Sequence, residues 1–159
     1  MRIISIATAV LISLFALTSA GCESSGNPFA GSTWTAGTHT VSFSHGVADW
    51  STADNMIVLK FDLITGASLP DATAAIPEIS TLKVNESRGV AITLAISSSL
   101  HFTADPSDPD ANANIVLTRL DLGPLGAVSG TITGKVRSVE NPSQILDLNA
   151  SFSDAPIAN

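Results

Sequence analysis

The chain has 159 residues, of which 13% are charged, and its seven Lys and Arg against 14 Asp and Glu give a net charge of −7. This length suffices for one domain with a core of its own. The few basic residues are scattered along the chain, so a phosphate backbone would meet no basic cluster, and the sequence argues against nucleic acid as a partner.

Residues 1–21 have the features of a secretory signal peptide. Arg2 supplies a positive start, residues 3–17 form a largely apolar run, and small residues follow. The run is shorter than the roughly 20 apolar residues that a membrane-spanning helix needs. We therefore expect residues 1–21 to be an export signal that is removed.

The segment Ser19-Ala20-Gly21-Cys22 resembles the lipobox of bacterial lipoproteins, whose cysteine is lipidated and becomes the first residue of the mature protein. The resemblance implies that Cys22 is a lipidation site and that the protein reaches the membrane through its lipid. No Asp follows Cys22, which implies the outer membrane, on its periplasmic or cell-surface face. The alternative is ordinary secretion after cleavage at Ala20, which would leave the only cysteine as a free thiol.

The predicted mature chain has two parts. Residues 22–31 form a lipidated N-terminus and a flexible tether, because residues 23–28 are short, polar and contain Gly and Pro. Residues 32–159 are predicted to form a single β-rich domain.

Alternating apolar and polar residues predict strands along this domain. The pattern is clearest at 57–63 and 145–152, and further strands are expected at 38–44, 115–122 and 128–136. Residues 82–102 are predicted to form a hairpin that turns near 86–89.

Turn signals separate these segments at His45-Gly46, Thr65-Gly66, 122–124 and 141–143. Residues 67–79 are interpreted as a loop, because Pro70 and Pro77 bracket them. The predicted fold class is all-β, an antiparallel β-sandwich or a partly open barrel of about seven or eight strands.

Two of these segments carry a second resemblance. The sequence AVSGTITGKV at 127–136, followed by 145–152, resembles the C-terminal hairpin of a loose group of uncharacterised bacterial lipoproteins. The sequence FAGSTWTA at 29–36 resembles their N-terminal element. The resemblance implies a β-rich exported domain and implies no activity.

One acidic loop is a candidate cation site. Asp108, Asp110, Asn112 and Asn114 place oxygen ligands at alternate positions, and calcium is the cation that such ligands suit. The EF-hand pattern fails, because its required glycine and final acid fall on Ala113 and Arg119. A solvated turn in which Asp and Asn cap the backbone is the favoured alternative, so no metal site is assigned.

No catalytic residue and no cofactor are assigned. His39 and His45 are separated by roughly 20 Å if they lie on one strand, His101 is distant in sequence, and no Gly-x-Ser-x-Gly motif occurs. Trp34 and Trp50 are the only two tryptophans in a chain without tyrosine, which limits stacking on sugars.

The sequence therefore predicts a lipid-anchored extracytoplasmic β-domain that acts as a non-enzymatic structural or interaction module at the cell envelope. The alternative is an envelope lipoprotein that binds a small ligand or calcium, using Trp34, Trp50 or the 105–114 loop. The sequence identifies no specific protein or small-ligand partner.

Overall fold

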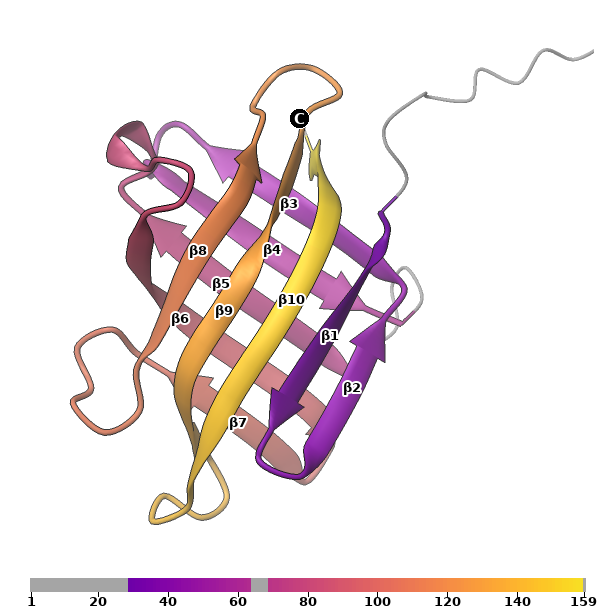
Figure 1. The fold of residues 1–159 in the computed structure, drawn as a ribbon. Helices are drawn as coiled ribbons and strands as arrows, with labels where there is room; N and C mark the ends of the chain where they lie inside the picture. The colour runs from indigo at the N-terminus through magenta and orange to yellow at the C-terminus, as the bar shows by residue number, and fades with distance from the viewer. Residues whose placement is uncertain (1–28, 64–68, 159) are drawn as a thin grey trace, which may run out of the picture.

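The computed structural model describes residues 29–63 and 69–158, which form β-strands and one short 3₁₀ helix (Figure 1). The strands are β1 (Gly31–Ala36), β2 (His39–Phe43), β3 (His45–Ser51), β4 (Met56–Asp62), β5 (Asp71–Pro77), β6 (Ser87–Ser97), β7 (Leu100–Ala104), β8 (Ala113–Leu120), β9 (Ala127–Ser138) and β10 (Ile145–Ala158). The 3₁₀ helix η1 (Ile79–Thr81) lies between β5 and β6. Within the described ranges, no helix is long and apolar enough to cross a membrane. The predicted signal peptide, Cys22 and the Thr65-Gly66 turn lie outside the described residues.

The sheet closes on itself as a barrel. Strands β3, β4, β5, β6, β8, β9 and β10 form a ring, in which each strand pairs with the next and β10 returns to β3. The hairpin of β1 and β2 lies outside the ring on β10, and β7 bridges β6 and β9 beyond the end of β8 (Figure 1). The described pairings are antiparallel except for β10 with β3, which is parallel and joins Ile157 to Ala48 and Ala158 to Asp49.

The predicted all-β class is confirmed, and its finer details are corrected. The sandwich alternative is wrong, because one continuous sheet surrounds the core rather than two separate sheets facing each other. The barrel is closed rather than partly open, because β10 reaches β3. Residues 29–63 and 69–158 form ten strands, seven of which close the barrel, where seven or eight strands were predicted. The additional strands include β3 and β5, which lie where the sequence predicted turns and a loop.

Strands with large apolar residues on one face follow the prediction. In β4 the alternating residues Ile57, Leu59 and Phe61 are buried, and in β10 the same holds for Leu148, Ala150 and Phe152. The strands predicted at 38–44, 115–122 and 128–136 correspond to β2, β8 and β9.

The predicted hairpin within 82–102 is misplaced. Its turn lies at residues 98–99 between β6 and β7, whereas Arg88 and Gly89 lie inside β6. The loop expected at 67–79 contains β5, whose buried positions are Ala72, Ala74 and Ile76. Alanine is a weak strand former, so the alternation in β5 carried little signal.

Side chains fill the barrel interior. Five aromatic rings form its centre at one end, where Phe61 lies 5.5 Å from both Trp34 and Phe152 and 6.3 Å from Phe43, measured between ring centroids. Phe29 also packs on Phe61, at 6.0 Å. Phe29 and Gly31, which the sequence placed in the predicted 22–31 tether, thus pack with the barrel.

Candidate functional site

The two tryptophans differ in their surroundings. Trp34 is fully buried, and its Nε1 donates a hydrogen bond of 2.7 Å to the Ser32 hydroxyl. Trp50 is half-buried at the end of β3, and its buried Nε1 has no hydrogen-bond partner among the described residues. Trp34 is therefore a core residue, whereas the ring of Trp50 is partly exposed.

The acidic loop between β7 and β8 is stabilised by its own side chains. Asp105 Oδ1 accepts hydrogen bonds from the backbone N–H and the hydroxyl of Ser107, at 2.8 and 2.6 Å. Asp108 Oδ1 accepts from the backbone N–H groups of Asp110 and Ala111, at 2.9 and 3.2 Å. The Asn112 side-chain amide donates to the carbonyl oxygen of Asp108 at 2.9 Å. These bonds are the local turn caps that the sequence favoured over a cation site.

Asp108 also has a cationic partner. Arg137 Nη2 lies 3.0 Å from Asp108 Oδ2 and 3.2 Å from Oδ1. The Asp110 backbone N–H, followed by the Arg137 guanidinium, lowers the pKa of Asp108 below its usual value. Asn114 is separate from this arrangement, since it is exposed on β8 opposite Thr133 and Gly89. Within the described ranges, no three His, Cys, Asp or Glu side chains form a group that could hold a metal ion.

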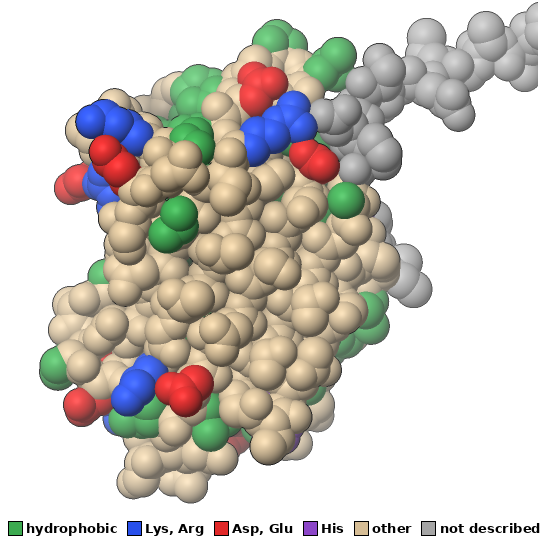
Figure 2. Space-filling model, in the orientation of Figure 1, with side chains coloured by type: hydrophobic (Ala, Val, Ile, Leu, Met, Phe, Trp, Pro, Cys, Tyr) green, Lys and Arg blue, Asp and Glu red, His purple; other side chains and the backbone are tan. Residues whose placement is uncertain are grey.

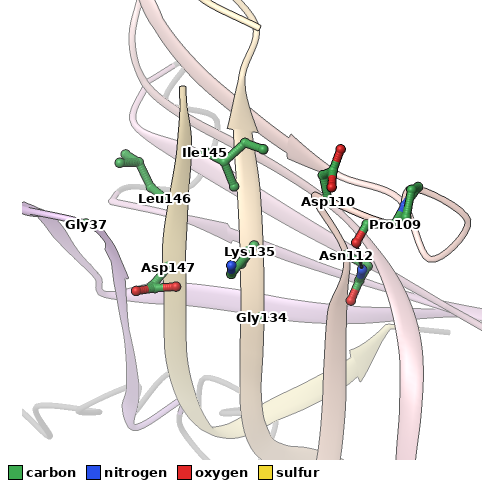
Figure 3. A pocket seen from close by; sticks show the side chains of 9 residues that line it. All are labelled: Gly37, Pro109, Asp110, Asn112, Gly134, Lys135, Ile145, Leu146 and Asp147. Carbon is green, nitrogen blue, oxygen red and sulfur yellow. Dashed lines mark hydrogen bonds between the residues drawn. The ribbon is translucent and has the colours of Figure 1, made fainter. Parts of the chain in front are cut away.

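A groove of about 760 Å³ opens beside this loop at one end of the barrel (Figure 3). Lys135 on β9 and Asp147 on β10 are direct cross-strand neighbours there, and Asp110 and Asn112 lie across the groove. Its other lining residues are Gly37, Pro109, Gly134, Ile145 and Leu146. The groove contains two of the four predicted cation ligands, Asp110 and Asn112, together with a lysine of opposite charge, so its chemistry does not single out one class of ligand.

The three histidines lie in separate places. The ring of His39 lies 6.0 Å from that of Phe102. His45 Nδ1 contacts Asp62 Oδ1 at 2.9 Å, without the geometry of a hydrogen bond. His101 contacts the Glu140 carboxylate through Nδ1 and through its backbone N–H.

A regular polar surface lies on the outside of β1, β10 and β9. We call it the hydroxyl face. It consists of two rows of cross-strand partners, each running across β1, β10 and β9. The first row is Thr33, Ser151 and Thr131, and the second row is Thr35, Asn149 and Thr133. These residues surround a shallow trough of about 400 Å³. Thr35 is partly exposed and the other five side chains are exposed.

The hydroxyl face is extended by its neighbours on both sides. On β2, Ser42 stands opposite Thr33 and Thr40 opposite Thr35, with oxygen–oxygen distances of 3.4 and 3.1 Å. On β8, Val116 and Asn114 continue the two rows. Figure 2 shows charged side chains gathered at the two ends of this side of the molecule, while the area between them is uncharged.

Comparison of the chain with protein-family models, with curated proteins and with solved structures gives no match.

The local sequence contains the residues of the hydroxyl face but no signal that they lie together. The pattern Thr-x-Thr occurs in both segments used for the second resemblance, at 33–35 and at 131–133. Period-2 alternation places both threonines of each pair on the outer face. Their alignment across β10 depends on long-range strand pairing, which no local pattern predicts.

Proposed function

We propose that this protein is an exported lipoprotein in which residues 1–21 are removed and Cys22 is lipidated. The barrel then stands at the outer membrane as a non-enzymatic structural or interaction module, and it acts through its outer surface.

The position of the first packed residue supports an anchored barrel. Phe29 contacts Phe61, and Ala30 donates a backbone hydrogen bond of 3.1 Å to Ser153. Only residues 23–28 separate Cys22 from this contact, and a fully extended chain of seven residues spans at most about 25 Å. A lipid on Cys22 would hold the barrel close to the bilayer, with the end that contains Phe29 toward the membrane.

The observation that carries the interaction role is the contrast between the inside and the outside of the barrel. The interior is filled by side chains such as Trp34, Phe61 and Phe102, each at most 1% exposed. The groove beside the acidic loop and the trough on the hydroxyl face both lie on the outer surface. A partner would therefore bind to the strands from outside rather than enter the barrel.

Mass spectrometry of the full chain extracted from bacterial membranes tests the anchor. We expect a mature protein that begins at Cys22 and carries two or three acyl chains, and we expect Cys22→Ser to move the protein to the soluble fraction. A soluble wild-type protein, or one that keeps residues 1–21, would overturn the proposal.

A further inference from the structure

We propose that the loop between β8 and β9 inserts into the lipid surface to which the protein is anchored. The loop comprises residues 121–126, and its tip carries Pro124 and Leu125. The inference rests on the proposed function, because the lipid on Cys22 brings the barrel to the bilayer. It adds a second point of contact, which gives the barrel a defined orientation on the membrane.

The tip of this loop exposes apolar surface. The Leu125 side chain is 64% exposed, more than any other large hydrophobic side chain within residues 29–63 and 69–158. Pro124 beside it is exposed as well, and Gly123 completes a tip that has no charge and no hydroxyl group. The transfer of such a surface from water into lipid is favourable.

The backbone holds Leu125 in a strained conformation. Its φ is +130°, which glycine adopts readily and leucine avoids because of its Cβ. Residues that keep such a conformation are concentrated at functional sites. A glycine at this position would suit the backbone better, and the exposed Leu125 side chain adds little to the core. A contact outside the protein therefore explains the leucine better than a role in folding.

Backbone hydrogen bonds fix the shape of the loop. The Gly123 carbonyl oxygen accepts from the N–H groups of Leu125 and Gly126, at 3.1 and 2.8 Å. At the base of the loop, the Asp121 N–H donates to the Ala127 carbonyl oxygen at 3.1 Å. Gly126 has no space for a side chain, because a Cβ would lie 2.0 Å from the Asp121 carbonyl oxygen. The turn thus presents Leu125 in one position, and insertion costs little conformational entropy.

The loop lies close to the place where the anchored end of the chain joins the barrel. The Ile157 N–H donates to the Gly126 carbonyl oxygen at 3.0 Å, so the loop contacts the C-terminal end of β10 (Figure 1). Ala30 bonds to Ser153, four residues earlier on β10, which is about 13 Å along the strand. Since the connection to Cys22 spans at most about 25 Å, an anchored barrel can bring this loop to the bilayer.

Trp50 lies at the same end of the barrel. Ala158, at the end of β10, pairs with Asp49, which is the chain neighbour of Trp50. The Trp50 side chain is half-buried, and its Nε1 has no hydrogen-bond partner among the described residues. Tryptophan is enriched at membrane–water interfaces, because its ring is apolar and carries one polar group. This end of the barrel therefore has a second residue that suits an interface.

The opposite end of the barrel is acidic. Its loops at 105–112 and 139–144 contain no Lys or Arg, and their acids are Asp105, Asp108, Asp110 and Glu140. Arg137 on β9 offsets the charge of Asp108, at 3.0 Å, and the end stays negative. Because the phospholipid surface is itself anionic, it repels these loops. Charge thus favours the orientation in which the β8–β9 loop faces the bilayer.

The end that carries the β8–β9 loop has compensated charges. Its two acids Asp121 and Asp154 both contact Arg119, at 3.7 and 2.7 Å. Hydrophobic side chains stand at the tip of this end, beyond the charged ones (Figure 2). The apolar tip can therefore enter the lipid while the ion pairs stay at the level of the headgroups.

The test places a fluorescent probe on the full, lipidated chain in vesicles of phosphatidylethanolamine and phosphatidylglycerol. Pro124→Cys supplies a thiol for an environment-sensitive dye, and lipids with spin-labelled acyl chains act as quenchers. The matched control is Val139→Cys with the same dye, because Val139 is 54% exposed in the turn at the opposite end. We expect blue-shifted emission and lipid quenching at position 124, and the emission typical of water at position 139.

A second substitution separates insertion from folding. Leu125→Gly, added to Pro124→Cys, should reduce the lipid quenching to the level of the position 139 probe. Its melting temperature should stay close to that of Pro124→Cys alone, because relief of the strained φ offsets the greater flexibility of glycine in the unfolded chain. If Leu125→Gly unfolds, Leu125→Gln replaces it, since it keeps the Cβ and removes the apolar end, and the same loss of quenching is expected.

Each outcome decides the inference. A chain that floats with the vesicles but keeps its position 124 probe in water overturns it and leaves the anchor intact. Quenching that survives the Leu125 substitution also overturns it. A probe shielded from water without lipid quenching would mean that a protein, or a second copy of this chain, covers the loop, and this too contradicts the inference. A chain that does not float overturns the proposed anchor, so the two failures are distinguishable.

Discussion

Trp34 and Ser32 form a buried pair on β1, in which the indole N–H donates to the Ser32 hydroxyl at 2.7 Å. That hydroxyl in turn donates to the carbonyl oxygen of Ser151 on β10 at 2.9 Å. The relay connects the core to the β1–β10 pairing, directly beneath the hydroxyl face. It explains why a polar residue occupies an interior position of β1.

Ser32→Ala should destabilise the protein by about 1–3 kcal/mol, because it leaves the buried Trp34 N–H without its acceptor. Urea unfolding followed by tryptophan fluorescence measures the change. Ser153→Ala, at an exposed position of β10, is the control and should stay within about 0.5 kcal/mol of the wild type. Equal effects of the two substitutions would contradict the role given to the relay.

Phe61→Ala should cost about 3–5 kcal/mol of unfolding free energy, because Phe61 is 1% exposed and contacts four other aromatic rings. Val139→Ala removes two methyl groups from an apolar side chain that is 54% exposed, and it should change little. Thermal and urea unfolding of both variants check this. A loss below 1 kcal/mol for Phe61→Ala would mean that the ring cluster does not form the centre of the core.

Gly130→Ala should destabilise the barrel by about 1–3 kcal/mol through overpacking. A Cβ at Gly130 would lie 2.6 Å from the backbone oxygen of Val116, which cannot move without disturbing the β8–β9 pairing. At Gly123 the nearest atom to a new Cβ is a side-chain oxygen of Asp121 at 3.2 Å, and this exposed carboxylate, which accepts a hydrogen bond of 3.1 Å from the Gly123 N–H, has to shift by only a few tenths of an ångström. Gly123→Ala is thus the matched control, and its unfolding midpoint should stay near that of the wild type.

Glu140 should make stability depend on pH. The backbone N–H of His101 donates to Oε2 at 3.0 Å and the His101 ring contacts Oε1, and together they lower the pKa of Glu140 from 4.5 to about 2. Because the folded state releases this proton more readily than the unfolded chain, the contribution to stability is present above about pH 4.5 and is lost as the pH falls toward 2.

The measurement is the urea midpoint of the wild type and of Glu140→Gln from pH 2 to pH 7. We expect a constant advantage of the wild type above about pH 5 that shrinks below it. Asp71 acts in the opposite direction, because burial raises its pKa, but it is present in both proteins and its effect cancels in the comparison. An advantage that is the same at pH 2 and pH 7 would contradict the assignment to Glu140.

The strands that the sequence predicted have large apolar side chains on one face. Ile57, Leu59 and Phe61 gave β4 a clear period of two, and Leu148 and Phe152 did the same for β10. β3 was missed because its interior positions include Gly46 and Ala48, which are too small to signal burial. The fold explains why residue 46 is a glycine, since a Cβ there would lie 2.8 Å from the rings of Phe29 and Phe61.

Barrel closure and the candidate site were beyond local patterns for a related reason. The pairing of Thr33 with Ser151 joins residues 118 positions apart in the chain, and the contact of β10 with β3 spans a similar separation. Alternation specifies which face a residue occupies, but it does not specify the partner strand. The acidic loop was the opposite case, because Asp105 and Asp108 bond to the residues that follow them, and such turns are encoded locally.

The parallel contact between β10 and β3 has a consequence for how the protein is made. Synthesis from the N-terminus delivers Ile157 and Ala158 after the strands on which they close, yet these two residues complete the ring against Ala48 and Asp49. The first strands therefore stay incompletely covered until nearly the whole chain has been synthesised. The ring therefore closes late, because β3 lacks its partner on one side until β10 has been made.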